Sequence, residues 1–361
     1  VGQVRAWFYY LHAVNVGLFG SNAFKNVIVT GTLAGNDGRK MSKSFGNYTD
    51  PNELMDTYSA DALRFLLLSS PVLNAEDYAL QDKDVSDVNR KLAMVWNMYD
   101  FFTLYASVDG WEHKGELADP SEDCQNPLDI WVISRVHQLI SEVDKHIQAY
   151  DMPNATKPIL EFIEDASNWY VRRSRKRFWK SEDDGDKNNA YGTLYYVLVQ
   201  LAKVMAPFTP FLSEELYRNL TGEESVHLVD WPEVGHVNEL MVERMAGLRH
   251  IITIGLSLRA EASIKVRQPL QKVVLSDALK DTFDDKMLEI LTEELNVKEV
   301  AFKPHEFDPH KSIPENVEEN GGLAGMNFYK VKELDTKLTP ALKREGLMRE
   351  VVRQVQSARK A

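Results

Sequence analysis

The sequence is poor in cysteine: Cys124 is the only one among 361 residues. A single thiol excludes a disulfide framework and any cysteine-rich zinc site, and it fits a reducing, cytoplasmic setting. His227, His236 and His250 are isolated histidines, so we assign no metal-binding role to them. We therefore expect no metal-binding residues and no zinc in this chain.

Long apolar runs are also missing, since none approaches the roughly 20 residues that a membrane-spanning helix needs. We therefore expect no membrane partner. The first residues resemble no signal peptide, and the chain does not begin with Met, so we expect it to start inside a domain.

An excess of positive charge is absent as well. The chain has 42 Lys and Arg residues against 54 Asp and Glu residues, which gives a net charge of −12. This balance argues against a surface coated with cations for nonspecific nucleic-acid binding. Any contact with RNA must come from local basic clusters.

The most informative stretch is a short cationic loop, Lys40-Met41-Ser42-Lys43-Ser44, behind an Asn36-Asp37-Gly38 turn. The β-branched, apolar residues 27–33 before it predict a buried parallel strand, and Asp50 before Pro51 predicts a helix start after it. Ligands of open α/β sheets bind at the carboxyl ends of strands. The loop is therefore a candidate phosphate site, the alternative being a solvated basic loop.

The loop resembles, at all five positions, the KMSKS signature of class I aminoacyl-tRNA synthetases. In that family the loop closes over ATP while the amino-acid carboxylate attacks the α-phosphate and pyrophosphate leaves. The resemblance implies ATP with Mg²⁺ as cofactor, Lys43 and Lys40 as catalytic groups, and Met41, Ser42 and Ser44 beside them in the ATP site. Preorganised cations near the developing charge lower such a barrier by about 3–4 kcal/mol.

Residues 3–19 are apolar around so much of their circumference that they predict a well-buried helix. The stretch also resembles the segment that lines the aminoacyl-adenylate pocket of isoleucyl-tRNA synthetases. That resemblance implies an adenylate contact for Gln3 and an aliphatic side-chain contact for Trp7, although Gly2 stands where many members have Asp. The alternative for Trp7 is packing in a core.

Further along, periodicity and Pro or Gly punctuation predict a largely helical chain. Helices are expected over residues 51–69 and 85–106, over a bundle formed by 128–150, 155–180, 187–206 and 208–221, and over 239–262. Residues 272–275, 281–295 and 297–302 predict a small β-α-β unit, and a last helix opens at Thr339-Pro340.

A second cluster of candidate site residues lies in the bundle, in the cationic segment, residues 168–180. Cations interleaved with aromatic residues can contact phosphates and stack on unpaired bases. The candidate tRNA-binding residues are Trp169, Arg172, Arg173, Arg175, Lys176, Arg177, Trp179 and Lys180. The alternative is a solvated helix end whose cations face the acidic loop at residues 182–186.

The cationic segment, followed by residues 190–195 and 206–211, resembles the anticodon-binding domain of isoleucyl-tRNA synthetases, most closely the eukaryote-like subgroup. The resemblance implies isoleucine, ATP and tRNA(Ile) as substrates of an isoleucine–tRNA ligase. The HIGH signature of the first half of the nucleotide fold is absent from this sequence, as is the inserted editing domain. We therefore expect the C-terminal portion of a longer synthetase, inactive by itself. The alternatives are a stand-alone helical tRNA-binding module, a valyl- or leucyl-type synthetase, or a structural helical protein.

The expected fold class is mainly α with α/β parts. Residues 1–50 are expected to form the second half of a Rossmann-type nucleotide fold, and residues 51–120 a helical connecting region that contacts the tRNA stem. Residues 121–235 are expected to form a helical-bundle anticodon-binding domain. Residues 236–361 are expected to form a small α+β C-terminal region that is truncated here.

Overall fold

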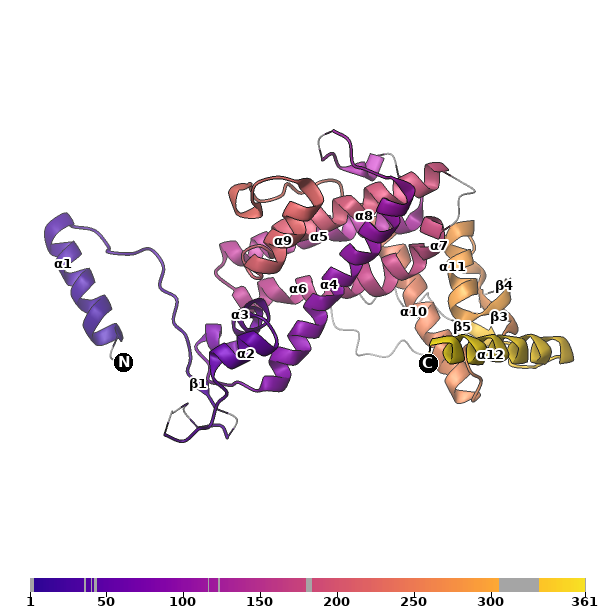
Figure 1. The fold of residues 1–361 in the computed structure, drawn as a ribbon, viewed down its shortest axis with the longest axis horizontal. Coiled ribbons are helices and arrows are strands. Elements are labelled where there is room, and N and C mark those ends of the chain that lie inside the picture. Colours follow the sequence, from indigo (N-terminus) through magenta and orange to yellow (C-terminus); the bar gives the residue numbers. More distant parts are fainter. Residues whose placement is uncertain are drawn as a thin grey trace. The chain divides into compact units, whose positions relative to one another are not determined.

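The computed structural model describes residues 3–35, 37–39, 41, 44–115, 117–122, 124–179, 184–304 and 331–360, with the elements labelled in Figure 1. The fold is mainly helical with small sheets, which confirms the predicted fold class. The chain divides into two compact units. The first comprises Val1–Val108, Gln138–Ser167 and Leu198–Val234, and the second comprises Asp109–His137, Asn168–Val197 and Gly235–Ala361.

The predicted first helix is present but is not buried. A π-helical stretch (Gln3–Phe8) leads into α1 (Tyr9–Phe19), which ends at Gly20 in a left-handed conformation with φ +64°. No residue of α1 is buried, so the expectation of a buried helix is wrong for the described residues. The apolar sequence of this helix predicts that its side chains pack against another part of the protein. It does not show whether the given chain contains that part.

The expected strand at residues 27–33 is much shorter than predicted. Only β1 (Leu33–Ala34) forms, in parallel pairing with β2 (Tyr78–Ala79), while Val27, Ile28 and Val29 are 42–58% exposed. Within the described residues, a paired strand begins only at Leu33. The parallel direction is confirmed, and the predicted burial of residues 27–29 is wrong because the described part of the chain pairs no strand with them.

The predicted helix over residues 51–69 is divided in two. Asp50 caps α2 (Pro51–Thr57) by accepting a hydrogen bond from the Asn52 N–H at 2.8 Å, as Asp before Pro predicts. The chain then breaks at Ser59, with φ 135°, whose Oγ caps α3 (Ala60–Ser69) by accepting from the Ala62 N–H at 3.1 Å. A serine that satisfies a free backbone donor permits this break inside an otherwise helical pattern.

The long helices agree closely with the sequence. They are α4 (Asp82–Asp109), α5 (Pro127–Gln148), α6 (Met152–Glu164), a π-helical turn (Asp165–Val171), α7 (Arg172–Trp179), α8 (Asp184–Met205) and α9 (Pro210–Thr221). Side chains at helical spacing, such as Val85, Leu92 and Val95, are at most 4% exposed and build the core of the first unit.

In the second unit, α10 (Glu239–Glu261) leads to a three-stranded sheet of order β4-β3-β5. Strands β3 (Leu270–Ser276) and β4 (Val297–Lys303) are parallel and are joined through α11 (Asp285–Leu295), which confirms the β-α-β prediction. The antiparallel β5 (Val331–Leu334) was not predicted. The final helix, α12 (Pro340–Lys360), begins as Thr339-Pro340 indicates.

Candidate nucleotide loop and nucleic-acid interface

The loop after β1 is closed at its base by one asparagine. The Asn47 side-chain amide donates to Asp37 Oδ1 at 2.9 Å, and the Arg39 N–H donates to the same oxygen at 3.0 Å. These hydrogen bonds, that of Asn47 foremost, lower the pKa of Asp37 below its ordinary value. Gly38 turns the chain with φ +74°, and Gly35 accepts from the Gly38 N–H at 2.9 Å.

Glycine at position 35 lets two backbone segments approach closely. A Cβ added at Gly35 would lie 2.0 Å from the Asn47 carbonyl oxygen, well inside any allowed contact. The Gly35 N–H donates to the Arg39 carbonyl at 2.7 Å. Among the described residues, the base of the loop is therefore fixed by backbone and amide contacts.

Of the five predicted ATP-binding residues, the structure describes two. Met41 is half-buried and Ser44 is exposed. Lys40, Ser42 and Lys43 lie outside the described residues, so their placement stays a prediction. In the part of the chain that the structure describes, no group of three or more His, Cys, Asp or Glu residues could hold a metal ion.

The predicted adenylate-pocket residues lie in the π-helical stretch before α1. Trp7 is 66% exposed, which corrects the alternative that it fills a core. Gln3 begins the same stretch. Phe8 and His12 meet Phe24, with ring centroids 5.5 and 6.1 Å apart, so the segment contacts its own following turn.

The cationic segment spans the end of the π-helical turn and α7, and two glutamates of α11 face it. Arg172 Nη1 lies 2.8 Å from Glu294 Oε1, and Arg173 Nη1 lies 3.0 Å from the same oxygen. Arg173 and Lys176 both form ion pairs with Glu293. Burial by itself raises the pKa of Glu293, but hydrogen bonds and charge from Lys176 and Arg173 lower it overall.

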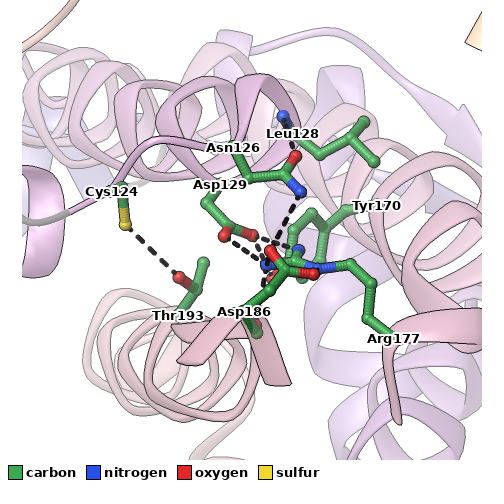
Figure 2. Close-up of polar contacts among 8 residues, drawn as sticks. All are labelled: Cys124, Asn126, Leu128, Asp129, Tyr170, Arg177, Asp186 and Thr193. Carbon is green, nitrogen blue, oxygen red and sulfur yellow. Dashed lines mark hydrogen bonds and ion pairs between the residues drawn. The ribbon is translucent and has the colours of Figure 1, made fainter. Parts of the chain in front are cut away.

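Arg177 turns into the protein rather than outward. Its Nη1 and Nη2 donate to the two oxygens of Asp129, each at 2.7 Å, and its Nε donates to Asp186 Oδ2 at 2.8 Å (Figure 2). Tyr170 donates its hydroxyl to Asp129 Oδ1 at 2.8 Å. Burial is the largest single effect on the pKa of Arg177 and lowers it, but the hydrogen bonds and charge of Asp129, the charge of Tyr170 and the hydrogen bond to Asp186 together raise the pKa overall. Burial and Asp129 together raise the pKa of Tyr170.

The two tryptophans of the cationic segment differ in exposure. Trp169 is 7% exposed, donates its indole N–H to Met245 Sδ at 3.3 Å, and lies under the Arg249 guanidinium at 5.3 Å. This burial corrects the expectation of an open stacking surface at Trp169. Trp179 is 59% exposed, and Arg175 is exposed too. Lys180 lies outside the described residues.

Sequence reasoning missed the acidic partners of these cations. Asp129, Glu293 and Glu294 lie 48 or more residues from the arginines they contact, and nothing local marks them. Asp186 could have been predicted, because it belongs to the acidic loop that the alternative interpretation names.

Among the helices that the structure describes, none combines the length and the apolar character that crossing a membrane requires.

Comparisons with known proteins give two family matches, one containing the loop and one containing the cationic segment. Residues 1–79 match the family of class I tRNA synthetases (I, L, M and V), and residues 129–274 match the anticodon-binding domain of tRNA ligases. The first match contains the loop after β1, and the second contains the cationic segment.

Curated relatives are named isoleucine–tRNA ligases. The protein of Treponema denticola is 38% identical over 95% of this chain, that of Dehalococcoides mccartyi 39% over 100%, and that of Chlamydia trachomatis 42% over 83%. The chain spans about a third of the length of these relatives, the aligned shares being 32%, 36% and 29%.

Among solved structures, the ternary complex of Agrobacterium radiobacter K84 agnB2 LeuRS with tRNA and LeuAMS shares the fold. The TM-score is 0.50 at 20% identity, over 64% of this chain and 27% of that one. Over most of its length, then, the chain is homologous to isoleucine–tRNA ligases, with a class I tRNA synthetase segment at residues 1–79 and an anticodon-binding domain at residues 129–274.

Proposed function

We propose that this chain is part of an isoleucine–tRNA ligase, which activates isoleucine with ATP to isoleucyl-adenylate and transfers it to tRNA(Ile). The observation that carries the proposal is the 38–39% identity to two isoleucine–tRNA ligases, aligned over 95% and 100% of this chain and so over both the loop and the cationic segment. A third isoleucine–tRNA ligase is 42% identical over 83% of the chain. The complete KMSKS sequence of the loop supports the use of ATP.

In this proposal Lys43 and Lys40 stabilise the negative charge that grows on the departing pyrophosphate. Lysine suits that role as a mobile point charge. Met41, Ser42 and Ser44 complete the ATP site, and Mg²⁺ accompanies ATP by shielding its phosphates. The contribution of the described residues is to hold the base of the loop in one conformation, through Asn47 and Gly35.

The exposed apolar residues of the first unit support a larger enzyme. Trp7, Leu18 and Phe19 are 66–72% exposed, and Ile28 is 58% exposed. Large apolar side chains exposed together on one segment mark a candidate interaction site. We assign Gln3 and Trp7 to the wall of the isoleucyl-adenylate pocket, which further residues of the ligase would complete.

For tRNA, the proposal separates surface residues from supporting ones. Arg172, Lys176 and Trp179 have side chains 47%, 65% and 59% exposed, and with Arg175 and Lys180 they form the proposed contact. Trp169, Arg173 and Arg177 hold the cationic segment in place through Met245, Glu294 and Asp129.

Four parts of the chain, residues 1–50, 51–120, 121–235 and 236–361, and a cytoplasmic location complete the proposal. Without the HIGH signature, this 361-residue chain forms no adenylate by itself.

The test is the substitution Lys43→Ala in the natural full-length enzyme. Charge that exists mainly in the transition state predicts a rate of adenylate formation about 100-fold lower or more, with isoleucine affinity almost unchanged. Isoleucine-dependent ATP–pyrophosphate exchange measures the rate, and equilibrium binding measures affinity. Exchange that depends on valine or leucine in place of isoleucine would overturn the substrate, and equal losses of rate and affinity would overturn the role of Lys43.

A further inference from the structure

The carboxylates of Glu293 and Glu294 pair with the cations of the cationic segment in the way that phosphate groups would. Two neighbouring carboxylates at the end of α11 receive three cations of α7, Arg172, Arg173 and Lys176. Arg173 divides its guanidinium between the two carboxylates, donating to both Glu293 and Glu294. Guanidinium groups bind carboxylate and phosphate oxygens with the same planar geometry.

The contacts differ in how easily another anion could replace them. Arg172 and Lys176 have side chains 47% and 65% exposed, so water and solutes reach their charged ends. Ion pairs at such exposed sites contribute little to stability and are screened by salt. Arg173 is 11% exposed and Glu294 is 12% exposed, so this inner pair fixes the two helices.

We propose that the phosphates of bound tRNA displace the carboxylates of Glu293 and Glu294 from Arg172 and Lys176. The inference rests on the proposed function and assigns a role to two acidic residues within it. In the free protein the acidic pair neutralises the cations. This suits a chain with net charge −12, because the two carboxylates weaken the attraction of Arg172 and Lys176 for unspecific polyanions. A ligand with several phosphates at the right spacing exchanges for both carboxylates, so the pair raises the threshold for binding.

The experiment measures the affinity of the 361-residue chain for a tRNA(Ile) transcript by filter binding at low and high salt. Three proteins are compared: the wild type, the double variant Glu293→Gln and Glu294→Gln, and the control Glu289→Gln. Glu289 is an exposed residue of the same helix, one turn before Glu293, and it takes part in none of these ion pairs, so the control removes a nearby charge without breaking one of the contacts. The double variant should bind about tenfold more tightly at low salt, with a smaller gain at high salt, because it lacks the competing anions. Adding Arg172→Ala and Lys176→Ala to it should remove the gain.

An affinity of the double variant equal to or below that of the wild type would overturn the exchange, provided circular dichroism shows it folded. If the double variant does not fold, the tRNA affinity of the single variant Glu293→Gln tests the exchange. This variant removes the exposed contact with Lys176 and keeps Glu294. A gain over Glu289→Gln supports the exchange, and the lack of one overturns it. If the wild type and all variants fail to bind tRNA, the proposed tRNA contact fails as well. If the wild type binds and only the gain is missing, the proposed function stands.

Discussion

Arg177 donates two parallel hydrogen bonds to the carboxylate of Asp129, each 2.7 Å long, and the Asp129 side chain has no exposed surface. The bidentate pair joins α7 to the start of α5, and Tyr170 and Asp186 complete it (Figure 2). The two hydrogen bonds and the positive charge of Arg177 compensate the buried carboxylate of Asp129, which without a partner would lower the stability of the fold. The most basic stretch of the chain therefore has a structural anchor inside it.

Arg177→Met should destabilise the second unit by about 3–5 kcal/mol, because Asp129 keeps a buried charge without its main partner. Urea unfolding followed by circular dichroism measures the change. Arg175→Met removes the same charge from an exposed position of the same helix, and its effect should stay within about 0.5 kcal/mol. Equal effects of the two substitutions would show that the pair with Asp129 contributes nothing special.

His137 is a second buried polar group, fixed in one tautomer by its contacts. Its Nδ1 accepts from the Gly235 N–H at 2.9 Å, so Nε2 carries the proton toward Asp119 Oδ2 at 3.0 Å. Tyr196 Oη lies 3.3 Å from Nε2. Burial lowers the pKa of His137 below its ordinary 6.5, against an upward effect of Asp119 and with a smaller lowering by His236.

A lowered pKa means that the unfolded chain binds a proton more readily than the folded one. The contribution of His137 to stability is therefore complete above about pH 6.5 and is lost as the pH falls below it. We expect the free energy of unfolding to decrease between pH 7.5 and pH 5.5, and His137→Gln to reduce that decrease. Urea midpoints at the two pH values test this. An equally steep decrease in the variant would place the pH dependence in other groups.

Gly35→Ala should disturb the base of the nucleotide loop, since the added methyl would lie 2.0 Å from the Asn47 carbonyl oxygen. Backbone must move to relieve that contact, so we expect adenylate formation by the full-length ligase to fall about tenfold or more, with thermal stability lowered only slightly. Gly192→Ala, in α8, is the control, because a Cβ added at Gly192 would meet nothing within 4 Å. It should leave the rate unchanged. Unchanged activity in Gly35→Ala would show that the loop base is not tightly fixed.

Much of the fold was predictable because its signals are local. The periodicity of residues 85–106 predicted α4, and Asp50 before Pro51 predicted the start of α2. The break at Ser59 was not predictable, since the same residue can continue a helix or cap one. Burial of residues 3–19 was predicted wrongly because apolar periodicity reports a need for contact and not the presence of a partner.

The candidate site, too, could be predicted only where its signals are local in sequence. The KMSKS match and the cluster of cations are contiguous in sequence, so both could be found there. Which cations face outward depends on Asp129, Glu293 and Glu294, whose approach is set by the tertiary fold. Sequence spacing treated Trp169 and Trp179 alike, whereas Met245 and Arg249 cover only the first of them.

The central claim is tested most directly by the affinity of the 361-residue chain for tRNA(Ile) measured against salt concentration. The account predicts binding that weakens steeply with salt and a shallower slope in the Arg172→Ala, Lys176→Ala variant, because fewer counterions are released. Trp179→Ala should instead weaken binding by about 1–3 kcal/mol at every salt concentration, through lost stacking. If folded variants of both kinds bind tRNA(Ile) with the wild-type affinity and slope, the cationic segment is not the tRNA contact and the account is contradicted.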